Sequence, residues 1–309
     1  EMYGKACHVL IGMDPSSQAA QARPELGEAC YQLSLLAAHG QGTEKRLGSA
    51  MKIAYWACQS GHAKACLMVG KAMLDGKAYV LDCREGEQCG QLESLPDGAS
   101  PEALVHQAAE GPREKDPAAT ARLAQGLLER SCFLDSRGCY HLGRSHLAGF
   151  GGAPDTLKAA SVLERSCGAG EPQGCALLAW LLLDGQAPGG AQPARLYAGK
   201  GCDGWDPWSC ETLGFLHLNG LGTVADTETA AGFFRRACGM DSASACHMLA
   251  GLLESGAASD AEGTPAQTLY GKACSLGLET ACRQEPLPAA REAVPPPLSP
   301  YFIETLVSQ

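Results

Sequence analysis

The sequence predicts an all-α solenoid built from helix-turn-helix repeats that disulfides staple together. Three observations carry this prediction. Cysteines recur in close pairs, most pairs recur every 36 residues or so, and each interval between pairs holds two helical stretches. A period of this size is typical of solenoids, in which each unit buries its apolar face against its neighbours.

The cysteine pairs have an almost constant internal spacing. Five of them have the form Cys-x7-Cys, and a sixth, Cys132 and Cys139, is one residue shorter. The step from one pair to the next is 27 or 28 residues wherever the repeat is uninterrupted. The five regular pairs are Cys58/Cys66, Cys167/Cys175, Cys202/Cys210, Cys238/Cys246 and Cys274/Cys282.

Each repeat contains two helical stretches with recognisable ends. The first helix runs from about Ala245 to a glycine stop at Gly256, and the second runs from about Thr268 to Cys274. A cysteine pair then bridges the end of one helix and the start of the next antiparallel one, where the ~5.5–6 Å Cα separation of a disulfide is readily met. A staple that closes roughly nine residues contributes about 2.6 kcal/mol in the chain-entropy model.

All sixteen cysteines are expected to pair with their sequence neighbours, including Cys7 with Cys30 and Cys83 with Cys89. Zinc is the first alternative, but zinc sites favour Cys-x2-4-Cys with a second close pair, so no metal is expected. Free buried thiols are the second alternative, and the strict pairing argues against them. Because disulfides persist only in oxidising compartments, the protein is expected outside the cytosol.

The repeat resembles the cysteine-rich branch of the Sel1-like repeat family. The residues that carry the resemblance are Cys139–Gly151 (CYHLGRSHLAGFG) with Lys158-Ala159 and Arg165–Gly170, then Leu213–Gly222 and Lys272–Gly277. The resemblance covers roughly residues 29–76 and 118–282. It extends to Helicobacter-type cysteine-rich secreted proteins and to a cysteine-rich mitochondrial cytochrome oxidase assembly factor. It implies a right-handed α/α superhelix that binds proteins.

Glycines mark the ends and contacts of the first helices. Gly149, Gly185, Gly220 and Gly256 each follow a first-helix pattern, where a left-handed cap favours glycine. Gly143 and Gly214 lie in mid-helix, although glycine there costs about 1 kcal/mol relative to alanine. Their presence predicts close packing against another helix.

The chain divides into three parts. Residues 1–28 form an incomplete N-terminal repeat and loop, 29–282 form the solenoid with an insertion at 77–117, and 283–309 form a proline-rich extended tail. The insertion either contacts a partner or is a decorative surface loop. The tail is expected to lie against its own solenoid or another subunit, with Tyr301, Phe302 and Ile303 as anchors.

The N-terminal residues Tyr3–Cys7 repeat Tyr270–Cys274 residue for residue. The chain is therefore expected to begin part-way through a repeat. Either residues that precede Glu1 complete this repeat, or another subunit stacks against it.

Charge and hydropathy limit the possible partners. The net charge of −10 opposes the attraction that supplies most non-specific nucleic-acid affinity, so nucleic acid is not an expected partner. The longest apolar run, Ala176–Leu183, is far shorter than the ~20 residues of a membrane helix, so no transmembrane segment is expected. The first residues of the sequence, Glu1–Lys5, lack the basic-then-apolar profile of a signal peptide, so any targeting segment is expected to have been removed or omitted.

One motif raises the possibility of catalysis. Ser49-Ala-Met-Lys52 fits the Ser-x-x-Lys pattern, and relatives in the cysteine-rich branch are linked to penicillin binding. No Ser-Asp-Asn or Lys-Thr-Gly motif follows, and Ser49 aligns with Lys158, an ordinary repeat position. A secreted penicillin-binding or β-lactamase-like enzyme that uses Ser49 and Lys52 is therefore the alternative function.

Two further groups of residues could form binding sites. Trp205 and Trp208 lie in an inter-repeat turn, where they form either a partner-binding tip or part of a packed turn. His146 and His217 occupy the same slot two repeats apart, too far for one metal ion at about 10 Å per repeat. We interpret them as packing residues.

The sequence as a whole predicts a non-enzymatic scaffold or accessory subunit of a larger assembly, without a cofactor. Its partner is expected to be a protein that enters the curved groove formed by the stacked first helices. The compartment is expected to be the periplasm, the cell exterior or the mitochondrial intermembrane space.

Overall fold

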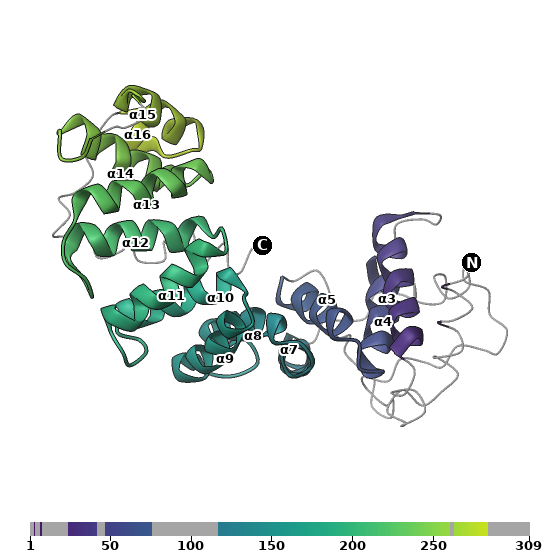
Figure 1. The fold of residues 1–309 in the computed structure, drawn as a ribbon. Coiled ribbons are helices and arrows are strands. Elements are labelled where there is room, and N and C mark those ends of the chain that lie inside the picture. The colour runs from purple at the N-terminus through teal and green to yellow at the C-terminus, as the bar shows by residue number, and fades with distance from the viewer. Residues whose placement is uncertain are drawn as a thin grey trace. The chain divides into compact units, whose positions relative to one another are not determined.

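The computed structural model describes Tyr3, Cys7 and residues 24–41, 47–75, 117–259 and 263–283. In these residues it contains thirteen α-helices, one short 3-10 helix and no strand, so the predicted all-α class is confirmed (Figure 1). The described residues form two compact units, unit 1 up to Asp155 and unit 2 from Thr156 to Arg283. The sequence did not predict this division.

Unit 1 is a series of helices in which each contacts the next along the chain. First helices α5 and α8 of successive repeats also contact each other. The helices are α3 (Pro24–His39), α4 (Leu47–Gln59), α5 (Ala63–Leu74), α7 (Pro117–Leu134) and α8 (Cys139–Ala148), with the 3-10 helix Ser136–Gly138 before α8.

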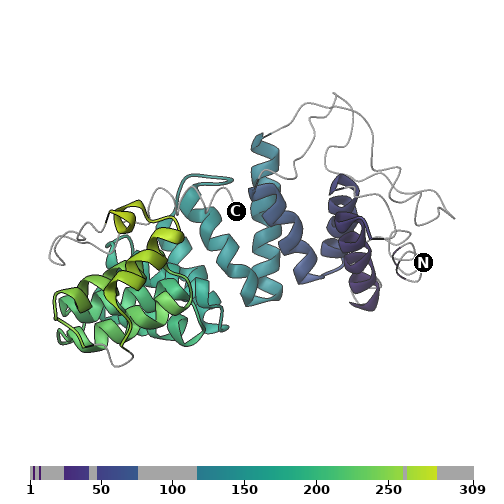
Figure 2. The ribbon, with the colours of Figure 1, turned by 90° about the horizontal axis from the view of Figure 1, so that it is seen from above.

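Unit 2 continues the same alternation of first and second helices, which lie in successive layers from α11 to α15 in Figure 1. Figure 2 shows the same helices from above, where they overlap. Its helices are α9 (Thr156–Gly168), α10 (Pro172–Leu183), α11 (Ala191–Asp203), α12 (Pro207–Asn219), α13 (Thr227–Gly239), α14 (Ala243–Glu254), α15 (Ala266–Ser275) and α16 (Glu279–Cys282). Helix α10 is apolar along most of its length and is buried on almost every side.

Seven disulfides staple the described helices, and each joins the neighbours that the spacing predicts. Their Cα atoms are 4.3 to 4.7 Å apart, closer than the common separation. The pairs are Cys7–Cys30, Cys58–Cys66, Cys132–Cys139, Cys167–Cys175, Cys202–Cys210, Cys238–Cys246 and Cys274–Cys282. No cysteine among the described residues is free. Cys83 and Cys89 lie outside them.

The glycines that end the first helices have the left-handed backbone that the sequence predicts. Gly149 and Gly220 are C-caps with φ of 66° and 67°, and Gly185 and Gly256 follow the caps with φ of 72° and 68°. Gly214 allows close packing, because a Cβ there would lie 2.7 Å from the Phe234 ring of α13. The prediction for the cap glycines is confirmed, and the packing prediction is confirmed at Gly214.

The predicted boundaries can be compared with the helices only in part. Helix α3 begins at Pro24, ahead of the predicted start of the solenoid at residue 29. Helix α7 begins at Pro117, the last residue assigned to the insertion. The rest of the insertion, residues 77–116, and the tail from residue 284 lie outside the described residues, as do the tail residues Tyr301 and Phe302.

Candidate protein-binding surface

Every eight-residue staple in the described residues contains one residue with positive φ, three positions after its first cysteine. Three staples have glycine there, namely Gly61, Gly170 and Gly277, with φ between 86° and 95°. The other two have Trp205 and Asp241, each with φ of 64°. Only glycine adopts this conformation without a steric cost, so these two residues depart from what the turn favours.

Asp241 and Trp205 differ in how well they suit this turn. Aspartate is one of the few residues that visit the left-handed region routinely, and Asp241 also forms an ion pair with Lys272 at 2.9 Å. A bulky aromatic residue in this region is a true outlier. Trp205 nevertheless has 72% of its side-chain surface exposed.

Arg236 lies over the Trp205 ring, with its Cζ atom 5.3 Å from the ring centroid. The same guanidinium donates a hydrogen bond to the carbonyl oxygen of Cys202 at 2.6 Å and lies 3.6 Å from a carboxylate oxygen of Asp203. The cation is therefore held at the C-terminal end of α11, where the helix dipole favours it. It supports one face of the indole and leaves the rest accessible.

Trp208 lies at the start of the next helix, not in the turn as the sequence predicted. Asp206 caps α12, its carboxylate accepting a hydrogen bond from the Ser209 backbone at 2.7 Å, and Pro207 and Trp208 follow as its first residues. Trp208 is half-buried, whereas Trp205 is exposed. Of the two predicted binding residues that the structure describes, Trp205 is therefore the one that a partner can reach freely.

The corresponding edge of unit 1 also exposes apolar side chains. Phe133 is 81% exposed and Leu134 is 42% exposed at the end of α7. They border an open depression of about 480 Å³ beside His62 and Arg130. Arg130 donates a hydrogen bond to the carbonyl oxygen of Gln59 at 2.9 Å, which is the counterpart of the Arg236 contact.

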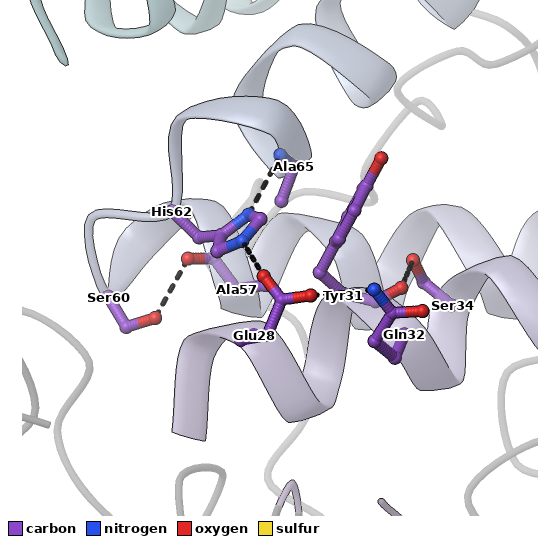
Figure 3. Close-up of polar contacts among 8 residues, drawn as sticks. All are labelled: Glu28, Tyr31, Gln32, Ser34, Ala57, Ser60, His62 and Ala65. Atoms are coloured by element: carbon purple, nitrogen blue, oxygen red, sulfur yellow. Dashed lines mark hydrogen bonds and ion pairs between the residues drawn. The ribbon is translucent and has the colours of Figure 1, made fainter. Parts of the chain in front are cut away.

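Polar side chains connect first helices of successive repeats in unit 1 (Figure 3). His62 caps α5, its Nδ1 accepting from the Ala65 backbone at 3.2 Å, so its Nε2 donates to Glu28 of α3 at 2.7 Å. The Tyr31 ring stacks on His62 at 4.7 Å. Hydrogen bonds from Gln32 and His62 hold the pKa of Glu28 below its usual value.

Unit 2 connects its first helices with a buried carboxylate. Glu211 of α12 is 9% exposed, and its Oε2 atom accepts hydrogen bonds from the hydroxyls of Ser242 and Ser244, both at 2.7 Å. Both serines lie at the N-terminus of α14, where the helix dipole favours a negative charge. Burial nevertheless raises the pKa of Glu211 above its ordinary value.

The other candidate residues from the sequence form no common site in the described chain. Lys52 is exposed on α4, and the side chain of Ser49 lies outside the described residues. His146 lies in unit 1 and His217 in unit 2, where it packs against Phe233 with ring centroids 5.3 Å apart. The described residues contain no group of three or more His, Cys, Asp or Glu side chains placed to hold a metal ion.

Sequence reasoning missed the basic side chains that bind the carbonyl ends of earlier helices. A signal for them was present, because a basic residue stands two positions before most helix-ending cysteines. These residues are Arg130, Arg165, Lys200, Arg236 and Lys272. Of them, Arg130, Arg236 and Lys272 donate to a carbonyl oxygen at the end of an earlier helix. It also missed that the turn glycine is replaced by Trp205 and Asp241.

No helix in the described part of the chain combines the length and apolar character needed to cross a membrane. No family model matches the sequence, and no curated protein matches it.

Two solved structures resemble this one. A protective antigen of uropathogenic Escherichia coli strains that displays an SLR fold superposes with a TM-score of 0.64 at 16% identity, over 84% of this chain and 48% of the antigen. The chain thus spans about half of that protein's length. A Sel1 repeat protein from Oxalobacter formigenes has a TM-score of 0.58 at 16% identity, over 83% of this chain and 87% of its own. The chain therefore has the fold of the Sel1-like repeat proteins.

Proposed function

We propose that this protein is a non-enzymatic scaffold that binds a partner protein and contacts it through Trp205. The observation that carries the proposal is an exposed tryptophan in a turn position that other staples give to glycine. Tryptophan and arginine are the residue types most enriched among side chains that dominate binding energy at interfaces. Trp205 and Arg236 belong to these two residue types, and the Arg236 guanidinium lies over the Trp205 ring.

The energetic argument is that the isolated chain gains little from Trp205. A left-handed backbone costs an L-residue about 1–2 kcal/mol, and a cation–π contact at an exposed site returns only about 0.5–1 kcal/mol. The exposed part of the indole adds no burial to the folded monomer. Burial against a partner supplies a reason for tryptophan at this position.

The disulfides support a place for the scaffold in an oxidising compartment, as the sequence also predicts. We assign it the role of an accessory subunit within a larger assembly, because a repeat array offers a long surface to several partners. Its net charge of −10 supports protein over nucleic acid as the partner.

The experiment is recovery of the partner by affinity purification and crosslinking mass spectrometry from the native source. Trp205→Gly should reduce recovery about thirtyfold, the loss expected for a binding hot spot, while its stability stays within about 1 kcal/mol of wild type. Val224→Ser, at an 83% exposed apolar residue elsewhere in unit 2, is the matched control and should recover the partner normally. Equal recovery by Trp205→Gly and wild type contradicts the proposal.

A non-enzymatic role is tested separately by nitrocefin hydrolysis. Wild type and Ser49→Ala should both hydrolyse nitrocefin no faster than buffer. A wild-type rate that Ser49→Ala abolishes would favour the penicillin-binding alternative.

A further inference from the structure

Arg144 of α8 is a buried cation whose donors lack partners. Its side chain is 6% exposed, and the Nε and Nη2 groups are buried without a hydrogen-bond acceptor. Buried arginines are almost always paired, because an uncompensated buried charge is strongly destabilising. Nothing in the repeat requires arginine at this position. The equivalent positions in α10 and α12 hold the buried apolar residues Trp180 and Phe215.

The neighbours of Arg144 in unit 1 leave the two donors unsatisfied. The guanidinium lies over the Tyr140 ring, with Cζ 5.8 Å from the centroid, and Nε and Nη2 remain without a hydrogen-bond partner beside it. Asp75 of α5 is near enough to favour the charged form electrostatically, but it accepts no hydrogen bond from Nε or Nη2.

Among the described residues, Arg144 shares its surroundings with a second cation. Lys71 of α5 and Arg144 both act electrostatically on His141, and together with burial they lower its pKa to about 3. His141 is therefore neutral near pH 7, and its Nδ1 atom is also buried without a hydrogen-bond partner. Among the described residues, the charged groups that act electrostatically here are the cations Lys71 and Arg144 and the carboxylate of Asp75, so positive charge exceeds negative charge by one.

We propose that Arg144 is the centre of a carboxylate-binding site on the first-helix face of unit 1, and that a partner peptide supplies the carboxylate. Nε–H and Nη2–H point the same way from one edge of the guanidinium, which is the arrangement that binds a carboxylate through two parallel hydrogen bonds. Lys71 adds long-range attraction for the anion. Because Asp75 already supplies one negative charge, a monoanionic carboxylate suits the site better than a doubly charged phosphate.

The identity of the ligand as a peptide rests on the proposed protein-binding function, whereas the carboxylate site itself can be tested without a partner. The probe is sodium acetate, compared with sodium chloride at equal ionic strength. Acetate should raise the melting temperature of wild type and shift the ¹⁵N NMR resonance of the Arg144 Nε–H group, which reports on the site independently of any variant.

The variant for this site is Arg144→Met, and its matched control is Arg122→Met, at an exposed arginine of α7 in the same unit. Arg144→Met should bind acetate at least about tenfold more weakly, the loss expected for one charge-assisted pair. Without acetate it should melt above wild type, since an unpaired buried charge is removed. Arg122→Met should respond like wild type. Equal responses of wild type to acetate and chloride, or an unchanged response in Arg144→Met, overturn the proposal.

Two short peptides distinguish the sources of the carboxylate. One carries a single internal glutamate and an amidated C-terminus, and the other carries only a free C-terminal carboxylate. If either peptide competes with acetate, the proposal is supported, and the competing peptide shows whether the carboxylate comes from a glutamate side chain or from a C-terminus. If neither peptide competes, a peptide is not the ligand. Trp205→Gly should bind acetate like wild type, so failure of the scaffold proposal and failure of this one give different results.

Discussion

The ammonium group of Lys272 donates a hydrogen bond to the carbonyl oxygen of Cys238, one repeat earlier in the chain, at 2.7 Å. Arg236 makes the same contact with Cys202 at 2.6 Å. In both cases the acceptor is the penultimate residue of a second helix, at the end of the helix that carries partial negative charge. Each carbonyl also accepts a hydrogen bond from the backbone N–H of the turn residue three positions later, Trp205 or Asp241. The side-chain contacts therefore connect second helices of successive repeats at carbonyls that also hold the turn.

Replacing this ammonium group should weaken unit 2. Lys272→Met keeps the aliphatic stem and should lower the free energy of unfolding by about 1 kcal/mol, since a charge-assisted hydrogen bond is lost from a side chain that is 36% exposed and partly screened. Lys200→Met is the control. Lys200 has the same position relative to its cysteine, but its ammonium group lies over the Tyr197 ring at 5.6 Å. Equal losses in urea unfolding of the two variants would contradict this role for Lys272.

The sequence predicts the fold well because a disulfide and a turn glycine each require a specific residue type. The recurrence of Cys274 and Gly277 in earlier repeats therefore locates both helix ends and the turn between them. Mid-helix glycine carries similar information, as Gly214 shows through its contact with Phe234.

The candidate sites were less predictable because they depend on departures from the repeat. Trp205 was noticed as an aromatic residue, but its strained backbone becomes evident only with the φ angle. Arg144 and Glu211 look like ordinary polar helix residues in the sequence, and their burial depends on neighbouring helices that the periodicity does not specify. The division after Asp155 has no sequence signal that we recognise.

Alanine should lower the stability of the protein at a turn position with positive φ where the native residue is glycine. Gly277→Ala should lower the free energy of unfolding by about 1 kcal/mol, because φ is 95° although no atom would contact the new Cβ. Gly239→Ala, at the last residue of α13, also meets no atom and has no positive φ, so it should be neutral or stabilising by up to about 1 kcal/mol. Denaturant unfolding of both variants measures the difference, and equal effects would mean that backbone strain is not the cause.

All sixteen cysteines should be oxidised in the native protein, each with its sequence neighbour. Non-reducing alkylation, intact-mass measurement and peptide mapping should find the seven described pairs together with a Cys83–Cys89 peptide. More than two free thiols, or a peptide that links Cys66 to Cys132, would refute the staple arrangement.

Glu211 should make unit 2 less stable as the pH rises. Burial raises the pKa of its carboxyl in the folded chain, so above its unfolded pKa the unfolded chain releases a proton that the folded chain retains. Glu211→Gln keeps an oxygen that can accept from Ser242 but cannot ionise. The melting temperature of this variant relative to wild type should therefore be higher at pH 7.5 than at pH 4. A pH-independent difference would show that the carboxyl does not titrate between these limits.

His141 should make unit 1 less stable as the pH falls, which is the opposite of the effect expected for Glu211. Burial, with help from Arg144 and Lys71, lowers its pKa from 6.5 to about 3 in the folded chain. Below pH 6.5 the unfolded chain therefore binds a proton that the folded chain excludes, and the stability that His141 contributes at neutral pH is lost progressively as the pH falls toward 3. His141→Gln removes this proton uptake.

The measurement is the melting temperature of wild type and His141→Gln between pH 7.5 and pH 5, in buffers without carboxylates so that the site proposed at Arg144 stays unoccupied. Wild type should lose more stability over this interval than the variant. His39→Gln, at an exposed histidine of α3, controls for the loss of a histidine in itself. If all three proteins lose stability equally, His141 takes up its proton in the folded chain, and the basic surroundings of Arg144 do not keep it neutral.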